Sequence, residues 1–297
     1  MKGRDQGPGR EVASGRPDRV HLNAVGAPIA SAVAAAPPGG GRGAPFDLPG
    51  GPDAALLLHG LTGSPFEVRH VAERLNRAGL RCVGPVMPGH GGRPEALAPL
   101  GWRDWVEGAR RELVRLDGAR RVFLVGCSMG ALVACALAEA LPGRVAGLAL
   151  LAPALGLSGP ARVAAALARA VPFGRRLPPV PKVGGSDVRD AGARHDNPTM
   201  VAVPLSAVGE LRLLAREVDE LLPAVRAPAL VVAGGRDHTV TLAGARRLAA
   251  RIGSGPARVV VLERSFHLVG IDVERDRCAG EVAAFFASIP PSAAEGA

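Results

Sequence analysis

Short apolar runs alternate with amphipathic stretches from about residue 54 to residue 288. The apolar runs are dominated by Ala, Val and Leu, which is typical of strands buried on both faces; they lie at 54–58, 121–125, 145–151, 229–233 and 258–262. The stretches between them predict helices, and a short further strand ends at Gly84; the helices are expected at 64–78, 102–116, 131–137, 205–222 and 272–288. The alternation predicts an α/β fold with a mostly parallel central sheet and helices on both faces.

A serine sits where one predicted strand passes into a helix, in Gly126-Cys127-Ser128-Met129-Gly130. A serine with glycines two residues away on each side, on a tight strand-to-helix turn, has the pattern of a nucleophile elbow. Glycine suits both positions because a Cβ would collide with the neighbouring strand or helix. The pattern alone is weak in a chain with 40 glycines, and the alternative is a glycine-rich turn with a buried serine. Its place between strand and helix favours a nucleophilic Ser128.

An acyl-transfer serine needs a base to take its proton and an acid to orient that base. Asp237 follows the predicted strand at 229–233, and His267 follows the one at 258–262. The carboxyl ends of parallel strands meet at one edge of a sheet. The order Ser, acid, His is also the one that accompanies a nucleophile elbow. We therefore expect Ser128, Asp237 and His267 to form a catalytic triad.

Each triad candidate has an alternative interpretation. Asp237 suits a turn or a helix cap, and His267 an ordinary loop. His90 and His238 compete for the role of base. His238 directly adjoins the proposed acid, so it is badly placed to reach both Asp237 and the serine. His90 precedes the nucleophile in the chain, contrary to the expected order.

A second loop follows the strand at 54–58, with the sequence HGLTG at 59–63. It leads into Ser64-Pro65-Phe66-Glu67, which reads as a capping box with proline at the first helical position. The loop is expected beside the elbow, where the backbone N–H groups of Leu61 and Met129 would form an oxyanion hole. We interpret His59 as a structural hydrogen-bonding residue.

Five segments resemble the α/β-hydrolase superfamily, and more closely its small bacterial carboxylesterases and monoacylglycerol lipases. They are LLHGLTG at 57–63, PGHG at 88–91, GCSMG at 126–130, GRD at 235–237 and SFH at 265–267. The resemblance spans roughly residues 53 to 288. Cys127, Met129 and Phe266 depart from the residues common in relatives, which affects pocket shape and removes no catalytic group. The resemblance implies the α/β-hydrolase fold and activity on short- to medium-chain esters or monoacylglycerols.

The alternation of strand and helix breaks after residue 153. Residues 154–206 contain many Pro and Gly residues and one expected helix at 161–171, which suits a small helical cap or lid inserted over the active site. A packing excursion without substrate contact is the alternative. The core then comprises 49–153 and 207–290. Residues 1–48 show no sustained hydrophobic periodicity, and we interpret them as a disordered or non-native extension. We interpret residues 291–297 as a flexible tail.

The composition limits the kinds of binding partner that we expect for this protein. The 297 residues are 47% hydrophobic and carry a formal net charge of +9. No basic cluster is interleaved with aromatics, so we expect no nucleic-acid binding. The four cysteines form no Cys-x-x-Cys pair and show no metal-ligand spacing, so no metal is expected. No apolar run reaches membrane-spanning length, and the weakly signal-like stretch at 24–36 is broken by Pro28, so we expect no stable membrane insertion and a cytoplasmic location.

The sequence therefore predicts a serine hydrolase that cleaves carboxylic esters through an acyl-enzyme on Ser128. No cofactor is expected, and the partner is a small-molecule ester, bound by a monomer or homodimer. A thioesterase or acyltransferase with the same triad is one alternative, because the pocket selects the leaving group and the acyl acceptor. A non-catalytic ligand-binding protein of hydrolase fold is another.

Overall fold

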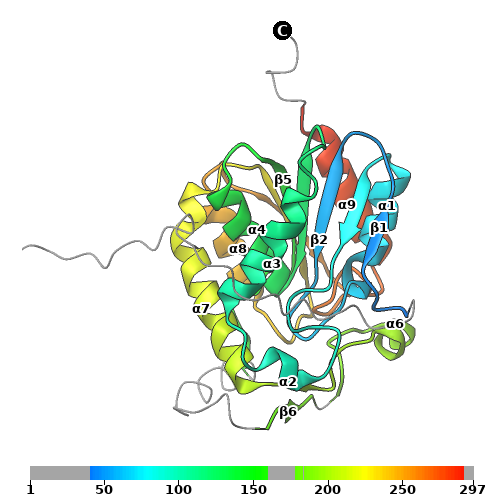
Figure 1. Ribbon diagram of the computed structural model, residues 1–297, viewed down its shortest axis with the longest axis vertical. Helices are drawn as coiled ribbons and strands as arrows, with labels where there is room; N and C mark the ends of the chain where they lie inside the picture. The colour runs from blue at the N-terminus through cyan, green and yellow to red at the C-terminus, as the bar shows by residue number, and fades with distance from the viewer. Residues whose placement is uncertain (1–40, 160–177, 183, 291–297) are drawn as a thin grey trace, which may run out of the picture. The chain divides into compact units, whose positions relative to one another are not determined.

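The computed structural model describes residues 41–159, 178–182 and 184–290. Within these ranges a seven-stranded sheet has the order β1-β3-β2-β4-β5-β8-β9 (Figure 1). Its strands are β1 Phe46–Leu48, β2 Ala54–Leu58, β3 Arg81–Gly84, β4 Val122–Cys127, β5 Val145–Leu151, β8 Ala229–Gly234 and β9 Arg258–Leu262. All neighbouring strands pair in parallel except the edge pair β1–β3, which is antiparallel. The predicted mainly parallel sheet is confirmed.

Helices cover both faces of this sheet, as the alternation predicted (Figure 1). Helices α1 and α9 pack against each other on one face. Helices α3, α4, α7 and α8 lie on the other face, where α4 contacts α3 and α7. The helix bounds are α1 Phe66–Arg77, α3 Trp102–Val114, α4 Met129–Ala140, α7 Leu205–Leu221, α8 Leu242–Arg251 and α9 Arg275–Ser288, with the short turns α2 Pro94–Leu97 and η3 Leu222–Ala224.

Burial explains the composition of the central elements. Strands β2 and β4 are buried at every position because helices lie on both sides of them. Alternate residues such as Leu57, Val125 and Cys127 join the core beneath α1 and α9. Helix α4 is apolar on nearly all sides because it lies between the sheet and two other helices. The residue that precedes α4 is therefore held by the most buried part of the molecule.

The start of the core lies earlier than expected. Strand β1 falls inside the segment 1–48 that we predicted to be a disordered extension, and it pairs with β3 from Phe46 to Leu48. Phe46 is buried, and a Cβ on Gly84 would come within 2.3 Å of its ring, so the phenyl ring fills the space that this glycine leaves. The expectation is wrong for the described residues 41–48. Residues 1–40 and 291–297 lie outside the described residues.

The insertion at 154–206 is described in part. A two-stranded antiparallel sheet joins β6 Val180–Pro181 to β7 Ala202–Val203. Helix α6 spans Ala191–Asp196. Asp190 is its N-cap, and the Asp190 carboxylate accepts a hydrogen bond from the Ala193 N–H. The helix expected at 161–171 lies outside the described residues. Among the helices that are described, none combines the length and apolar character needed to cross a membrane.

Candidate active site

Ser128 occupies a strained turn between β4 and α4. Its backbone angles are φ 54° and ψ −111°, and it is one of three non-glycine residues with positive φ in the described ranges. Such strain persists only where the surroundings impose it. A Cβ on Gly126 would lie 2.3 Å from the Gly130 carbonyl oxygen, and one on Gly130 would lie 2.2 Å from that of Leu58. The steric reason given for the two glycines is confirmed.

The three predicted triad residues meet at the carboxyl ends of β4, β8 and β9. His267 Nε2 lies 2.9 Å from Ser128 Oγ, and His267 Nδ1 lies 2.8 Å from Asp237 Oδ2. A carboxylate can only accept, so Nδ1 carries the proton and Nε2 accepts from the serine hydroxyl. Ser128 and His267 are 7% and 5% exposed, which shields this line of hydrogen bonds from water.

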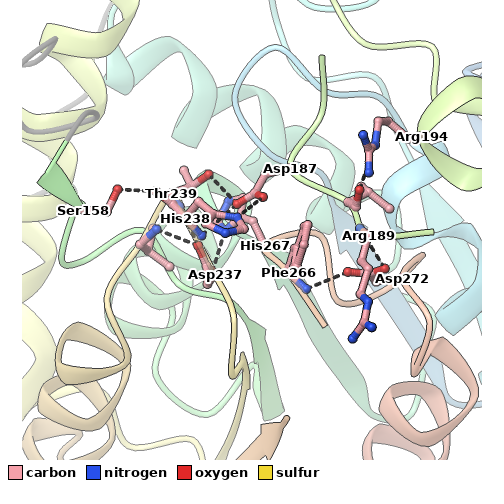
Figure 2. A network of polar contacts seen from close by, with 12 residues as sticks. Ser158, Asp187, Arg189, Arg194, Asp237, His238, Thr239, Phe266, His267 and Asp272 are labelled. Carbon is pink, nitrogen blue, oxygen red and sulfur yellow. Dashed lines mark hydrogen bonds and ion pairs between the residues drawn. The ribbon is translucent and has the colours of Figure 1, made fainter. Parts of the chain in front are cut away.

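Asp237 is fixed by its own turn. Its Oδ1 accepts hydrogen bonds from the N–H groups of Thr239, at 2.8 Å, and Val240, at 2.7 Å. Its Oδ2 is left to face His267 (Figure 2). The alternative interpretation of Asp237 as a turn former is therefore also correct, because one oxygen shapes the turn while the other orients the imidazole.

The surroundings of His267 favour its protonated form. Burial by itself would lower the pKa of His267, but the charge and hydrogen bond of Asp237 outweigh burial, and the charges of Asp187 and Glu67 act in the same direction. The pKa of His267 is consequently raised above the ordinary value for histidine. An imidazole in this position is a strong acceptor for a serine proton.

The competing histidines are engaged elsewhere. The side chain of His238 is 65% exposed and its Nδ1 pairs with Asp187 Oδ1 at 2.8 Å. His90 is buried and its Nδ1 lies 3.0 Å from the Pro88 carbonyl oxygen. His59 accepts a hydrogen bond from the Met87 N–H at 3.0 Å, which fits the structural role predicted for it. Among the described residues, the histidine that is hydrogen-bonded to Ser128 is His267.

Two backbone N–H groups beside the serine are available. A Cβ on Gly60 would lie 3.3 Å from the Cβ of Ser128, so the loop at 59–63 passes directly beside the serine. Met129 is the first residue of α4. Within the described ranges, no group accepts a hydrogen bond from the N–H of Leu61 or of Met129. Unpaired donors next to a nucleophile suit the binding of a negative oxygen.

The loop is held from one side by α1. Glu67 is buried, and its Oε2 accepts a hydrogen bond from the Gly60 N–H at 2.9 Å. Burial raises the pKa of Glu67. The capping box predicted for Ser64 and Glu67 is wrong: α1 begins at Phe66 without a side-chain cap, because this carboxylate turns toward the loop instead.

The insertion holds the other side of the loop. Thr62 has a φ of 61°, and its carbonyl oxygen accepts from the Met200 N–H at 2.9 Å and from Thr199 Oγ1 at 3.0 Å. Lys182 Nζ donates to Thr62 Oγ1 at 3.1 Å and to Thr199 Oγ1 at 2.8 Å. Burial lowers the pKa of Lys182. Our sequence interpretation missed Lys182, although it is one of only two lysines in the chain.

Comparison with known proteins identifies the family. The profile of the serine aminopeptidase S33 family (Hydrolase_4) matches residues 52–274. The chain belongs to this α/β-hydrolase family. It is 27% identical over 244 residues to the thermostable monoacylglycerol lipase of Bacillus sp. (strain H-257), covering 82% of this chain and 94% of that protein. A carboxylesterase of Bacillus subtilis (strain 168) is 25% identical over 235 residues, covering 78% and 91%.

The solved structures lead to the same fold. A structure from work on the metagenome-derived lipolytic enzymes LipS and LipT superposes with a TM-score of 0.75 and 29% identity, covering 83% of this chain and 98% of that one. The monoacylglycerol lipase of Paleococcus ferrophilus superposes with a TM-score of 0.70 at 19% identity, covering 83% and 98%. In the described part of this chain, no three His, Cys, Asp or Glu side chains are grouped so as to hold a metal ion.

Proposed function

We propose that this protein is a serine hydrolase that cleaves carboxylic esters through an acyl-enzyme on Ser128. The observation that carries the proposal is the line of hydrogen bonds from Asp237 through His267 to Ser128, which stands on a strained strand-to-helix turn. The names of the similar proteins, a monoacylglycerol lipase and a carboxylesterase, support the ester bond as the target.

The geometry of the site supports the following proposed reaction. Ser128 Oγ bonds to the acyl carbon as its proton passes to His267 Nε2, and Asp237 stabilises the imidazolium. The negative oxygen of the tetrahedral intermediate accepts hydrogen bonds from the Leu61 and Met129 N–H groups, beside the positive end of α4. Collapse breaks the ester C–O bond, and His267 gives its proton to the departing alcohol. A water molecule, deprotonated by His267, then releases the acid and restores Ser128.

Monoacylglycerols and short- to medium-chain acyl esters are the proposed substrates, in keeping with the similar proteins. The insertion at 154–206 is proposed to form a cap over the site. Its contacts with the Thr62 loop through Lys182 and Thr199, and with the loop after β8 through the Leu157–Val240 bridge, support this placement.

A panel of p-nitrophenyl esters of increasing chain length, with a monoacylglycerol and a matched thioester, tests the proposal. We expect ester turnover by the wild-type protein and labelling of Ser128 by a fluorophosphonate, with both lost in Ser128→Ala. Well-folded protein that takes no label, or full ester turnover by Ser128→Ala, would overturn the mechanism. Preference for the thioester would instead indicate a thioesterase.

A further inference from the structure

One acidic residue of the insertion lies against the triad without belonging to it. Asp187 lies between β6 and α6, and its side chain is 18% exposed. Its carboxylate accepts three hydrogen bonds from the loop that follows β8. They come from the His238 N–H at 3.0 Å, His238 Nδ1 at 2.8 Å and Thr239 Oγ1 at 3.1 Å (Figure 2). The N–H of this same Thr239 holds Asp237.

The backbone of Asp187 reaches the other half of the triad. Its carbonyl oxygen accepts hydrogen bonds from the N–H groups of His267 and Leu268, both at 3.2 Å. Asp187 thus binds two loops. Its side chain binds the acid loop, which follows β8 and carries Asp237, and its main chain binds the base loop, which follows β9 and carries His267. A residue with both contacts fixes the separation of the two loops, on which the hydrogen bond from Asp237 to His267 depends.

A buried carboxylate, that of Asp272, holds the same segment in place. Asp272 is fully buried, and its Oδ1 accepts from the N–H groups of Arg189, at 3.0 Å, and Asp190, at 2.9 Å. Its Oδ2 accepts from the Phe266 N–H at 2.6 Å (Figure 2). The base loop is therefore tied to the insertion on both sides of His267, through Phe266 and through Leu268. The sequence prediction placed Asp272 in the last helix, whereas α9 begins at Arg275.

Nearby charges also affect the protonation of the His267 imidazole. Burial opposes the charged form of His267, and the carboxylates of Asp237, Asp187 and Glu67 favour it, which together raise the pKa of His267. Asp237 is hydrogen-bonded to the ring. Asp187 and Glu67 act through their charge. His238 contacts the Asp187 carboxylate and forms a T-shaped pair with the Phe266 ring, with 4.5 Å between the ring centroids.

We propose that Asp187 is a positioning residue for the catalytic base: it joins the acid loop, the base loop and the insertion, and its carboxylate supplies a second negative charge beside His267. The role rests on the proposed function, because the catalytic imidazolium forms when Ser128 gives its proton to His267. A charge placed near that imidazolium in a buried site is worth more than it would be in water. The insertion therefore contributes to the chemistry as well as to any covering of the site.

Three variants separate charge from shape. Asp187→Asn keeps the size and removes the charge, Asp187→Glu keeps the charge and shifts the carboxylate, and Asp47→Asn is a matched control at the β1 edge, where Asp47 pairs with Arg81. The measurements are kcat and KM for a p-nitrophenyl ester from pH 5 to 9, with folding checked by circular dichroism. The acid limb of kcat/KM reports the ionisation of the base in the free enzyme.

We expect Asp187→Asn to move the acid limb to lower pH, because loss of a nearby carboxylate lowers the pKa of His267. Its kcat at the plateau should fall roughly tenfold with KM little changed, since small misplacements of catalytic groups are costly. Asp187→Glu should have a lower kcat than wild type, but its acid limb should lie at the same pH. Asp47→Asn should change neither quantity. If Asp187→Asn does not fold, Asp187→Ser replaces it with the same expected movement of the limb.

An unmoved acid limb in folded Asp187→Asn or Asp187→Ser would overturn the proposal, as would equal movement in Asp187→Glu. Either result would leave a purely structural role for Asp187. Failure of the proposed function is a different outcome, because the wild-type protein would then neither hydrolyse the ester nor be labelled at Ser128 by a fluorophosphonate.

Discussion

At the scale of single residues, the site depends on one proton moving along a short line of atoms. Ser128→Ala removes the atom that attacks, and His267→Ala removes the acceptor of its proton. We expect either change to lower kcat by ~10⁴-fold or more, with the oxyanion donors supplying the residual rate. Steady-state kinetics on a p-nitrophenyl ester measure the loss.

The matched control is Ser64→Ala. Ser64 is a buried serine whose hydroxyl has no hydrogen-bond partner among the described residues, so its loss breaks no hydrogen bond there and should leave kcat within about twofold of wild type. A similar fall in both serine variants would mean that Ser128 acts through folding and not through chemistry.

The variant Asp237→Asn tests whether Asp237 fixes the tautomer of His267. An amide in place of the carboxylate can donate to Nδ1 of His267, which leaves Nε2 protonated and unable to accept from Ser128. We expect kcat to fall by ~10⁴-fold. The raised pKa of His267 adds a second expectation for the wild-type protein, namely an acid limb of kcat/KM above the pH of about 6.5 at which free histidine titrates. A limb below that pH would contradict the assigned charges.

At the scale of elements, the loop at 59–63 is shaped from two directions. Glu67 on α1 holds the Gly60 N–H, and Lys182 from the insertion holds the strained Thr62 with the help of Thr199. The Lys182 ammonium is partly buried and donates to two hydroxyl oxygens, those of Thr62 and Thr199.

Lys182→Met should therefore loosen the oxyanion loop. We expect kcat to fall roughly tenfold, less than the 10²- to 10³-fold loss typical of removing an oxyanion donor outright, and the rate of fluorophosphonate labelling to fall in parallel. KM should change little, because ester binding precedes the formation of the oxyanion. Thr199→Ser keeps both hydroxyl contacts and serves as the control. Wild-type kcat in folded Lys182→Met would show that the loop keeps its shape without the ammonium.

The sequence predicts the helices and strands well, but it predicts poorly the polar side-chain contacts that connect them. Strands such as β4 and β8 are apolar along their whole length, and that pattern follows from burial on both faces. Ser128, Asp237 and His267 could be located because each follows such a strand. Strand β1 was missed because three residues carry little pattern and its pairing with β3 depends on the folded sheet.

Asp187, Lys182 and Asp272 were missed for a related reason. Each accepts from or donates to groups far away in the chain, and no local spacing in the sequence identifies such a partner. Glu67 shows how local rules can mislead: its position suits a capping box, but the folded loop offers the Gly60 N–H instead.

At the scale of the whole molecule, stability should depend on pH through two buried histidines. Burial lowers the pKa of His59 to about 3 and that of His90 to about 4. Both titrate near 6.5 once unfolding exposes them. Between about pH 5 and 6.5 the unfolded chain therefore binds more protons at these sites, and the free energy of unfolding rises with pH by up to about 1.4 kcal/mol per pH unit for each histidine.

Glu67 acts in the opposite direction, because its raised pKa keeps a proton on the folded protein above the pH at which the unfolded chain loses it. A comparison of variants removes this contribution. His90→Gln retains a donor for the Pro88 carbonyl and cannot titrate, so urea unfolding between pH 5 and about 6.5 should show a pH slope shallower than that of wild type by up to about 1.4 kcal/mol per unit. Equal slopes in wild type and His90→Gln would mean that His90 takes up a proton without unfolding, which would contradict the low pKa assigned to it.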